Sequence, residues 1–295
     1  MFWYSLYFGF FRLLASLPLR CLYLISDFLF VAICYLIRYR RKVVFENLRN
    51  AFPEKTEKER RQIARKFYRF LCDLIIEIIK LTNIDKSKIN RRIRYSNPEM
   101  FDELYRKGKQ IFITAGHYGN WEWTSTLQDT IPHHHATLYQ PLENKLFDKF
   151  FYYLRTKHGA DAIPINMAIR AIVQFNQENK LTALGFLSDQ SPPRNAVQYW
   201  TTFLNQETSV YLGVEKLARR YNAAVVYYEV RRVKRGYYEV DTTLITENAA
   251  ETGEKEITNR HIQLLEETIR RKPQYWLWSH RRWKHKRVKN PTDGV

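Results

Sequence analysis

Apolar residues between positions 57 and 81 recur with the spacing of an α-helix. Thr56 and Glu59 stand just before them in the pattern of a capping box, so the sequence predicts a long amphipathic helix that ends near Leu81. Asn97 followed by Pro98 is typical of a second helix start. Further helices are predicted at 121–128, 143–157, 168–177, 209–221 and 255–271.

Short apolar runs bounded by turn residues alternate with these helices. They predict strands at residues 111–115, 136–139, 182–187, 223–230 and 237–244. Strands that alternate with helices predict an α/β fold, with a mixed, mostly parallel sheet flanked by helices. No internal repeat or low-complexity linker interrupts this pattern.

The N-terminal segment differs from the rest in its composition. Residues 1–37 are rich in aromatic side chains, hold only Arg12, Arg20 and Asp27 as charged residues, and precede a basic run at 38–42. The apolar stretch is too long for a signal peptide, and no small-residue cleavage site follows it. We expect residues 1–38 to be a membrane anchor, which either spans the bilayer or lies in its interface. A buried core helix of a soluble protein is the alternative.

The charge balance predicts an acidic partner. The 295 residues carry 48 Lys and Arg against 30 Asp and Glu, a net charge of +18, which suits nucleic acid, an anionic membrane, a phosphorylated substrate or an acidic protein. Basic residues and tryptophans alternate at 276–287 and would suit bases or lipid headgroups. The N-terminal segment favours the membrane, so we expect no nucleic-acid partner. The basic runs at 58–61 and 91–94 are solvated faces or docking surfaces for an acidic protein.

Two residue types argue against a metal or disulfide site. Only three cysteines occur, all in the first quarter of the chain and none in a paired motif. The consecutive residues His133, His134 and His135 cannot all face one ion from a strand. We therefore expect no metal site.

The segment 114–122 carries the strongest local signal for chemistry. His117 follows a predicted strand, Gly119 allows a tight turn, and Glu122 begins the next helix. Across such a turn Glu122 would reach one imidazole nitrogen and leave the other to take a proton, as a general base does. Open α/β sheets place their sites at this end of their strands. A strand-end histidine with only a local hydrogen bond is the alternative.

These residues resemble the H-x-x-x-x-D/E block of glycerolipid acyltransferases, in the form found in bacterial lipid A biosynthesis acyltransferases. The resemblance covers nearly the whole chain, since several separate blocks follow in the family's order. They are residues 42–48 with 51–53, the histidine block, Leu154 with Arg155, residues 187–191, Thr208 with Gly213 and 217–219, and residues 273–284.

The resemblance implies that residues 39–295 are an acyltransferase domain. It implies transfer of a fatty acyl chain from an acyl carrier protein to a hydroxyl of a lipid A precursor, at the cytoplasmic side of the cell inner membrane. His117 would be the base and Glu122 its support, while Arg155 and Asp189 would bind substrate or shape the site. Backbone N–H groups near Asn120 would face the substrate oxyanion. The resemblance implies chemistry that needs no metal, no organic cofactor and no covalent enzyme intermediate.

Two alternatives stay open at this point. One is an acyltransferase of another bacterial glycolipid or aminolipid, since residues 190–193 depart from the commoner family form. The other is a non-catalytic basic protein that associates with membranes or nucleic acid.

Overall fold

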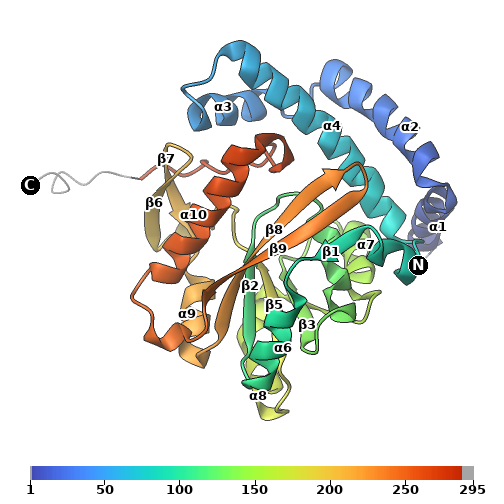
Figure 1. Cartoon of the computed structure of the whole chain (residues 1–295). Helices are drawn as coiled ribbons and strands as arrows, with labels where there is room; N and C mark the ends of the chain where they lie inside the picture. The colour runs from blue at the N-terminus through green and yellow to red at the C-terminus, as the bar shows by residue number, and fades with distance from the viewer. Residues whose placement is uncertain (1, 288–295) are drawn as a thin grey trace, which may run out of the picture.

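A seven-stranded sheet forms the centre of the computed structural model, which describes residues 2–287 (Figure 1). The strand order is β1-β9-β8-β2-β5-β3-β4, and every neighbouring pair is parallel except the antiparallel pair β8 and β9. The predicted mixed, mostly parallel α/β fold is therefore confirmed. The strands are β1 (Ile93–Tyr95), β2 (Ile111–Ala115), β3 (His134–Tyr139), β4 (Asp161–Pro164), β5 (Thr182–Leu187), β8 (Ala224–Lys234) and β9 (Tyr237–Thr246).

Helices cover both faces of this sheet. In β2, Ile111 and Ile113 contribute to one apolar cluster, whereas Phe112 belongs to another on the opposite face. This alternation is the period of two that a strand buried on both faces requires. The helices are α1 (Phe2–Ser16), α2 (Leu19–Val31), α3 (Arg41–Ala51), α4 (Glu57–Leu81), α5 (Lys86–Asn90), α6 (Pro98–Arg106), α7 (Lys145–Thr156), α8 (Ala168–Gln177), α9 (Gly213–Tyr221) and α10 (Glu256–Arg271).

Helix α4 has the predicted cap and the predicted end. The backbone N–H of Glu59 donates to the Thr56 hydroxyl at 3.3 Å, and the Glu59 carboxylate accepts from the Thr56 backbone at 2.7 Å. The helix packs beside the long β8–β9 hairpin, and α2 and α1 lie along its other side (Figure 1). It thus connects the N-terminal segment to the sheet.

Two of the predicted helices take another form. The helix predicted from residue 209 begins only at Gly213, because Ser209 and Val210 belong to the antiparallel hairpin of β6 (Tyr199–Phe203) and β7 (Gln206–Val210). Residues 121–128 lie in a 3₁₀ helix, Trp121–Asp129. Three consecutive hydroxyl side chains, at positions 124–126, donate to the carbonyls three residues before them, which suits its tighter turn.

The tryptophan-rich C-terminal segment is part of the core, and this corrects its interpretation as a headgroup- or base-binding surface. Trp276 and Trp278 are almost fully buried, as is Arg282. The segment pairs with the loop after β2, since the Leu277 N–H donates to the His117 carbonyl at 3.1 Å. Its indoles therefore stabilise the loop that carries His117.

Candidate active site

The loops that follow β2 and β5 form the centre of the candidate site. These strands are parallel neighbours in which Ala115 lies opposite Leu187. His117 and Asp189 each stand two residues beyond these strand ends, so the sheet brings them together although they are far apart in sequence. The site lies at the carboxyl edge of the parallel strands, as predicted.

Asp189 is the carboxylate that contacts His117. Its Oδ1 lies 2.6 Å from His117 Nδ1, and its Oδ2 accepts from the His117 backbone N–H at 2.9 Å and from the Trp276 indole at 2.8 Å. Burial alone would raise the pKa of Asp189, but the charge of His117 and these hydrogen bonds outweigh it and lower the pKa. Asp189 is therefore ionised at neutral pH and accepts the Nδ1 proton.

This contact determines which ring nitrogen of His117 can act as a base. Since Nδ1 donates to an ionised carboxylate, the neutral ring has its lone pair on Nε2. The Gln190 amide lies 3.2 Å from Nε2 and donates to it. The imidazole is 15% exposed, and the Trp121 ring packs against it at 4.9 Å between centroids. A substrate hydroxyl that displaces the Gln190 amide would meet a ready acceptor.

Glu122 does not contact His117, which corrects the expected pairing. Both of its carboxylate oxygens bind the Arg155 guanidinium, at 2.6 and 3.1 Å, and the Trp121 indole donates to one of them at 3.2 Å. Burial would lower the pKa of Arg155, but the Glu122 charge outweighs it and raises the pKa. Sequence spacing pointed to Glu122 and the family resemblance to Arg155, and neither showed that the two form an ion pair with each other.

The Asn120 side chain is held in the interior of the protein. It is fully buried, and its amide donates to the Glu77 carboxylate at 2.9 Å. The contribution expected of backbone N–H groups near Asn120 to an oxyanion site stays a prediction. Glu77 also accepts from Tyr23 and Tyr238, at 2.8 and 2.6 Å. No local sequence pattern indicates Glu77 as part of the site, because its position fits the apolar periodicity of α4.

Gly119 makes the turn between His117 and the 3₁₀ helix possible. Its φ is +64°, and a Cβ there would lie 2.0 Å from the Val230 carbonyl oxygen. Its N–H donates to the Tyr275 carbonyl at 3.0 Å. The tight turn predicted at this glycine is confirmed.

A largely apolar pocket of about 480 Å³ opens beside His280. The Ser191 N–H donates to the His280 ring at 3.4 Å, one residue beyond the Gln190 that contacts His117. Burial lowers the pKa of His280 to about 4, so this ring is neutral at physiological pH. The lining residues come from the N-terminal segment, α4 and the C-terminal segment: Ile33, Ile37, Tyr39, Arg40, Leu71, Ile75, Leu277, Ser279 and His280.

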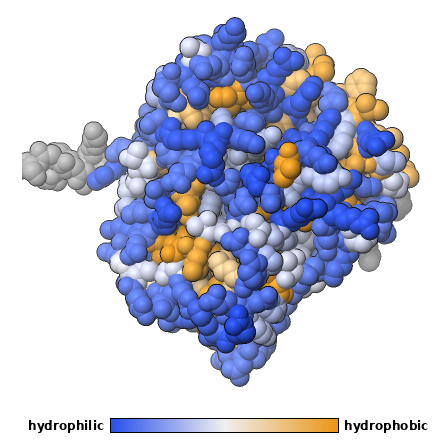
Figure 2. Space-filling view, viewed as in Figure 1, coloured by the Kyte–Doolittle hydropathy of each residue, from blue (hydrophilic) through white to orange (hydrophobic). Residues whose placement is uncertain are grey.

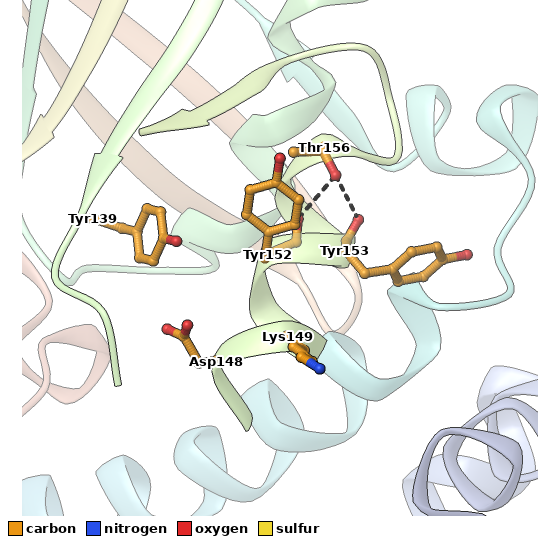
Figure 3. A pocket seen from close by; sticks show the side chains of 6 residues that line it. All are labelled: Tyr139, Asp148, Lys149, Tyr152, Tyr153 and Thr156. Carbon is orange, nitrogen blue, oxygen red and sulfur yellow. Dashed lines mark hydrogen bonds between the residues drawn. The ribbon is translucent and has the colours of Figure 1, made fainter. Parts of the chain in front are cut away.

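A second pocket, of about 290 Å³, lies between the end of β3 and α7. Tyr139, Asp148, Lys149, Tyr152, Tyr153 and Thr156 line it, and Figure 3 shows the Tyr139 and Tyr152 rings and the Asp148 carboxylate on one side of α7. The Arg155 guanidinium lies 5.4 Å from the centre of the Tyr139 ring. The Glu122–Arg155 pair thus connects this pocket to the His117 loop.

The three successive histidines have different partners. His133 and His134 use Nε2 for the Lys109 carbonyl and for Asp161, at 3.0 and 2.7 Å. His135 is buried, and burial lowers its pKa to about 4. The residues that the structure describes include no group of three or more His, Cys, Asp or Glu side chains placed to hold a metal ion.

Comparison with known proteins identifies the family of the chain. The family model described as bacterial lipid A biosynthesis acyltransferase matches residues 1–285, nearly the whole sequence. A search of curated proteins gave no significant match. The chain therefore belongs to the bacterial lipid A biosynthesis acyltransferase family and is an acyltransferase.

Proposed function

We propose that this enzyme transfers a fatty acyl chain from an acyl carrier protein thioester to a hydroxyl of a lipid A precursor. The observation that supports the mechanism best is the state of His117, which donates to Asp189 through Nδ1 and has Nε2 as an acceptor at the site. The family supports the acyl transfer and the type of acceptor. We propose that the reaction takes place at the cytoplasmic side of the cell inner membrane.

In the proposed reaction His117 acts as general base and then as general acid. Nε2 takes the proton of the acceptor hydroxyl while the hydroxyl oxygen attacks the thioester carbonyl carbon. The tetrahedral intermediate collapses with cleavage of the C–S bond, and the imidazolium returns its proton to the leaving sulfur. The products are an ester and a free thiol. Asp189 fixes the tautomer and stabilises the imidazolium, as the carboxylate does in catalytic triads. This sequence of steps needs no metal or organic cofactor.

Glu122 and Arg155 act on this reaction through the shape of the site. Their ion pair connects the start of the 3₁₀ helix to α7. This 3₁₀ helix begins at Trp121, four residues after His117. It would hold the wall between the His117 loop and the tyrosine-lined pocket in place. Arg155 stacks on Tyr139 and Phe151 at 5.4 and 5.3 Å, so its orientation is fixed by packing as well as by charge.

The two pockets suit the two substrates. The pocket beside His280 has aliphatic walls from Ile33, Ile37 and Ile75, which suit a fatty acyl chain. The pocket beside Arg155 has tyrosine rings and the Asp148 carboxylate, which suit the apolar face and the hydroxyl groups of a sugar ring. We assign the acyl donor to the first pocket and the glycolipid acceptor to the second.

An acidic carrier protein would suit the charge of the chain. The net charge of +18 attracts an acidic donor over long range. Arg91 and Arg94 are exposed in the run at 91–94, and Lys58 and Arg61 in the run at 58–61. These two runs are the candidate docking sites, which charge-reversal variants of each run would distinguish.

The test is acyl transfer by the purified full-length enzyme, with products weighed by mass spectrometry. Donors are acyl carrier protein and coenzyme A thioesters, and acceptors are an under-acylated lipid A precursor and unrelated lipids. We expect one ester-linked acyl group on the precursor, preference for the carrier-protein donor, and no product from the His117→Ala variant. His134→Ala is the matched control. His134 also pairs with a carboxylate, since its Nε2 lies 2.7 Å from Asp161, but this pair lies outside the site. Product from unrelated lipids alone, or normal turnover by His117→Ala, would contradict the proposal.

A further inference from the structure

The N-terminal helices present an apolar face to the surroundings. Phe10 and Leu13 of α1, Leu24 and Phe28 of α2, and Leu36 and Ile37 beyond it are each at least 60% exposed. Figure 2 shows apolar surface at the edge of the molecule where α1 and α2 lie in Figure 1. A contiguous apolar face of this kind on a folded domain marks a surface that contacts another apolar phase.

The stretch Leu19–Leu36 is long and apolar enough to cross a membrane, with a mean hydropathy of 1.8. Its 18 residues would measure about 27 Å as a helix, close to the thickness of a bilayer core. Length and composition therefore allow both a spanning helix and one that lies in the interface. The contacts of this stretch with the rest of the enzyme decide between the two.

Both ends of the stretch are attached to the same helix of the catalytic body. Before it, Lys80 of α4 donates to the carbonyls of Ala15 and Leu17, at 2.7 and 2.9 Å. After it, Tyr68 of α4 donates to the Tyr39 carbonyl at 2.8 Å. A helix that crosses the bilayer has its two ends on opposite sides of the membrane, so these contacts argue against that arrangement.

The middle of the stretch is attached as well. Ser26 donates to Asp73 at 2.6 Å, and Arg235 donates to Asp27 at 2.9 Å. Gly236, next to Arg235, has a φ of +72°, and a Cβ there would lie 2.2 Å from the Tyr23 hydroxyl. A spanning helix would lose these partners and carry the Asp27 carboxylate into hydrocarbon, which is unfavourable for a charged group.

We propose that α1 and α2 form an anchor that lies in the plane of a single leaflet and does not cross the membrane. The exposed apolar face enters the acyl-chain region of an anionic leaflet, while the opposite face stays on α4. Charge supports an anionic lipid surface as the partner, because the exposed residues Arg12, Arg20, Arg38, Arg41 and Lys42 flank the apolar face.

This arrangement connects the membrane surface to the active site. Tyr23 of α2 and Asn120 of the His117 loop donate to the same buried carboxylate, that of Glu77. Ile33 and Ile37 line the pocket that contains His280. The lipid-facing helix thus supplies a wall of the pocket that we assign to the acyl chain. Only the assignment of this pocket to the acyl chain rests on the proposed function, and the depth of the helices in a membrane can be measured without turnover.

Depth-dependent fluorescence quenching in vesicles tests the proposal. The background is the full chain with the substitutions Cys21→Ser and Cys34→Ser. In this background Leu24, Phe28 or Leu36 is replaced, one at a time, by a cysteine that carries an environment-sensitive dye. Cys72 can remain, since it is buried and burial raises the pKa of its thiol to about 12. The vesicles contain phosphatidylethanolamine, phosphatidylglycerol and lipids spin-labelled at shallow or deep acyl positions. We expect the same shallow depth at all three positions. A spanning helix would place positions 28 and 36 at depths that differ by about 12 Å, and that result would overturn the proposal.

A second measurement does not need labelled variants. Asp27→Leu removes one of the two carboxylate partners of Arg235, the other being Asp73, but makes the stretch more apolar. The in-plane anchor predicts a Tm in detergent lower by at least about 2 °C, whereas Phe28→Leu on the exposed face should leave Tm unchanged. An unchanged or higher Tm for Asp27→Leu would contradict the attachment of α2 to the turn between β8 and β9.

Discussion

His117 and Asp189 are 2.6 Å apart between Nδ1 and Oδ1, although they lie in loops after two different strands. Parallel pairing of β2 with β5 places both loops at one edge of the sheet. The pair has the geometry of a base and its orienting carboxylate. It is therefore the feature from which the catalytic predictions follow.

Asp189→Asn should greatly reduce turnover with little change in folding. An asparagine amide can donate to Nδ1, which favours the tautomer with the proton on Nε2 and removes the base. The analogous change in a serine protease triad lowers kcat about 10⁴-fold, so we expect a loss of roughly 10²- to 10⁴-fold here. Steady-state kcat measures the effect, and Asp161→Asn, at the other His–Asp pair, is the control. A kcat within threefold of the native value would refute the role of Asp189.

The Glu122–Arg155 pair should show strong coupling in a double-mutant cycle. Glu122→Gln or Arg155→Met alone leaves a largely buried charge without its partner, which costs about 3–5 kcal/mol. The double variant should recover much of that stability but not the activity. Chemical denaturation of all four proteins measures the coupling. The exposed pair of Arg49 and Glu57 is the reference and should couple far more weakly. Equal coupling in the two pairs would contradict a structural role at the site.

Gly119→Ala should destabilise the enzyme more than Gly108→Ala. Both glycines have positive φ, at +64° and +69°, but an added Cβ clashes with the Val230 carbonyl only at position 119. Gly108→Ala should cost about 1 kcal/mol for the backbone conformation. Overpacking at position 119 should add about 1–3 kcal/mol and displace His117. Thermal unfolding and kcat test this, and equal effects of the two variants would contradict it.

Mild acid should destabilise the fold through its buried histidines. Burial lowers the pKa of His261 to about 4, whereas an unfolded histidine titrates near 6.5. Between these two pKa values the folded state binds fewer protons than the unfolded state. The free energy of unfolding therefore decreases as the pH falls from about 6.5 towards 4. The shift corresponds to about 3 kcal/mol for this residue. Between pH 7 and 4.5 the unfolding free energy of the His261→Gln variant should fall less than that of the native enzyme. Parallel curves for variant and native enzyme would rule out this contribution.

The local elements of the fold follow from the sequence, but their neighbours do not. The periodic apolar positions and the capping box predict α4, and short apolar runs predict β2 and β5 with their observed bounds. Periodicity does not encode that β5 inserts between β2 and β3. For this reason the sequence pointed to Glu122, which is near His117 along the chain, and not to Asp189 as the partner of its ring.

The composition of the C-terminal segment likewise does not reveal how the segment packs. Tryptophans among basic residues resemble a surface that binds headgroups or bases. In the structure the Trp276 indole donates to Asp189 at 2.8 Å and is buried. The long-range pairing of residues 275–277 with the His117 loop causes this burial, and no local pattern reports it.

The most direct test of the account is the mass of the glycolipids made in a host that lacks its own late lipid A acyltransferases. The host expresses the native chain, His117→Ala or His134→Ala, with equal amounts of membrane-located protein. The account predicts one added ester-linked acyl group on the lipid A precursor with the native chain and with His134→Ala, and none with His117→Ala. The account would be contradicted if the host with His117→Ala made glycolipids with the added acyl group, or if the host with the native chain made none.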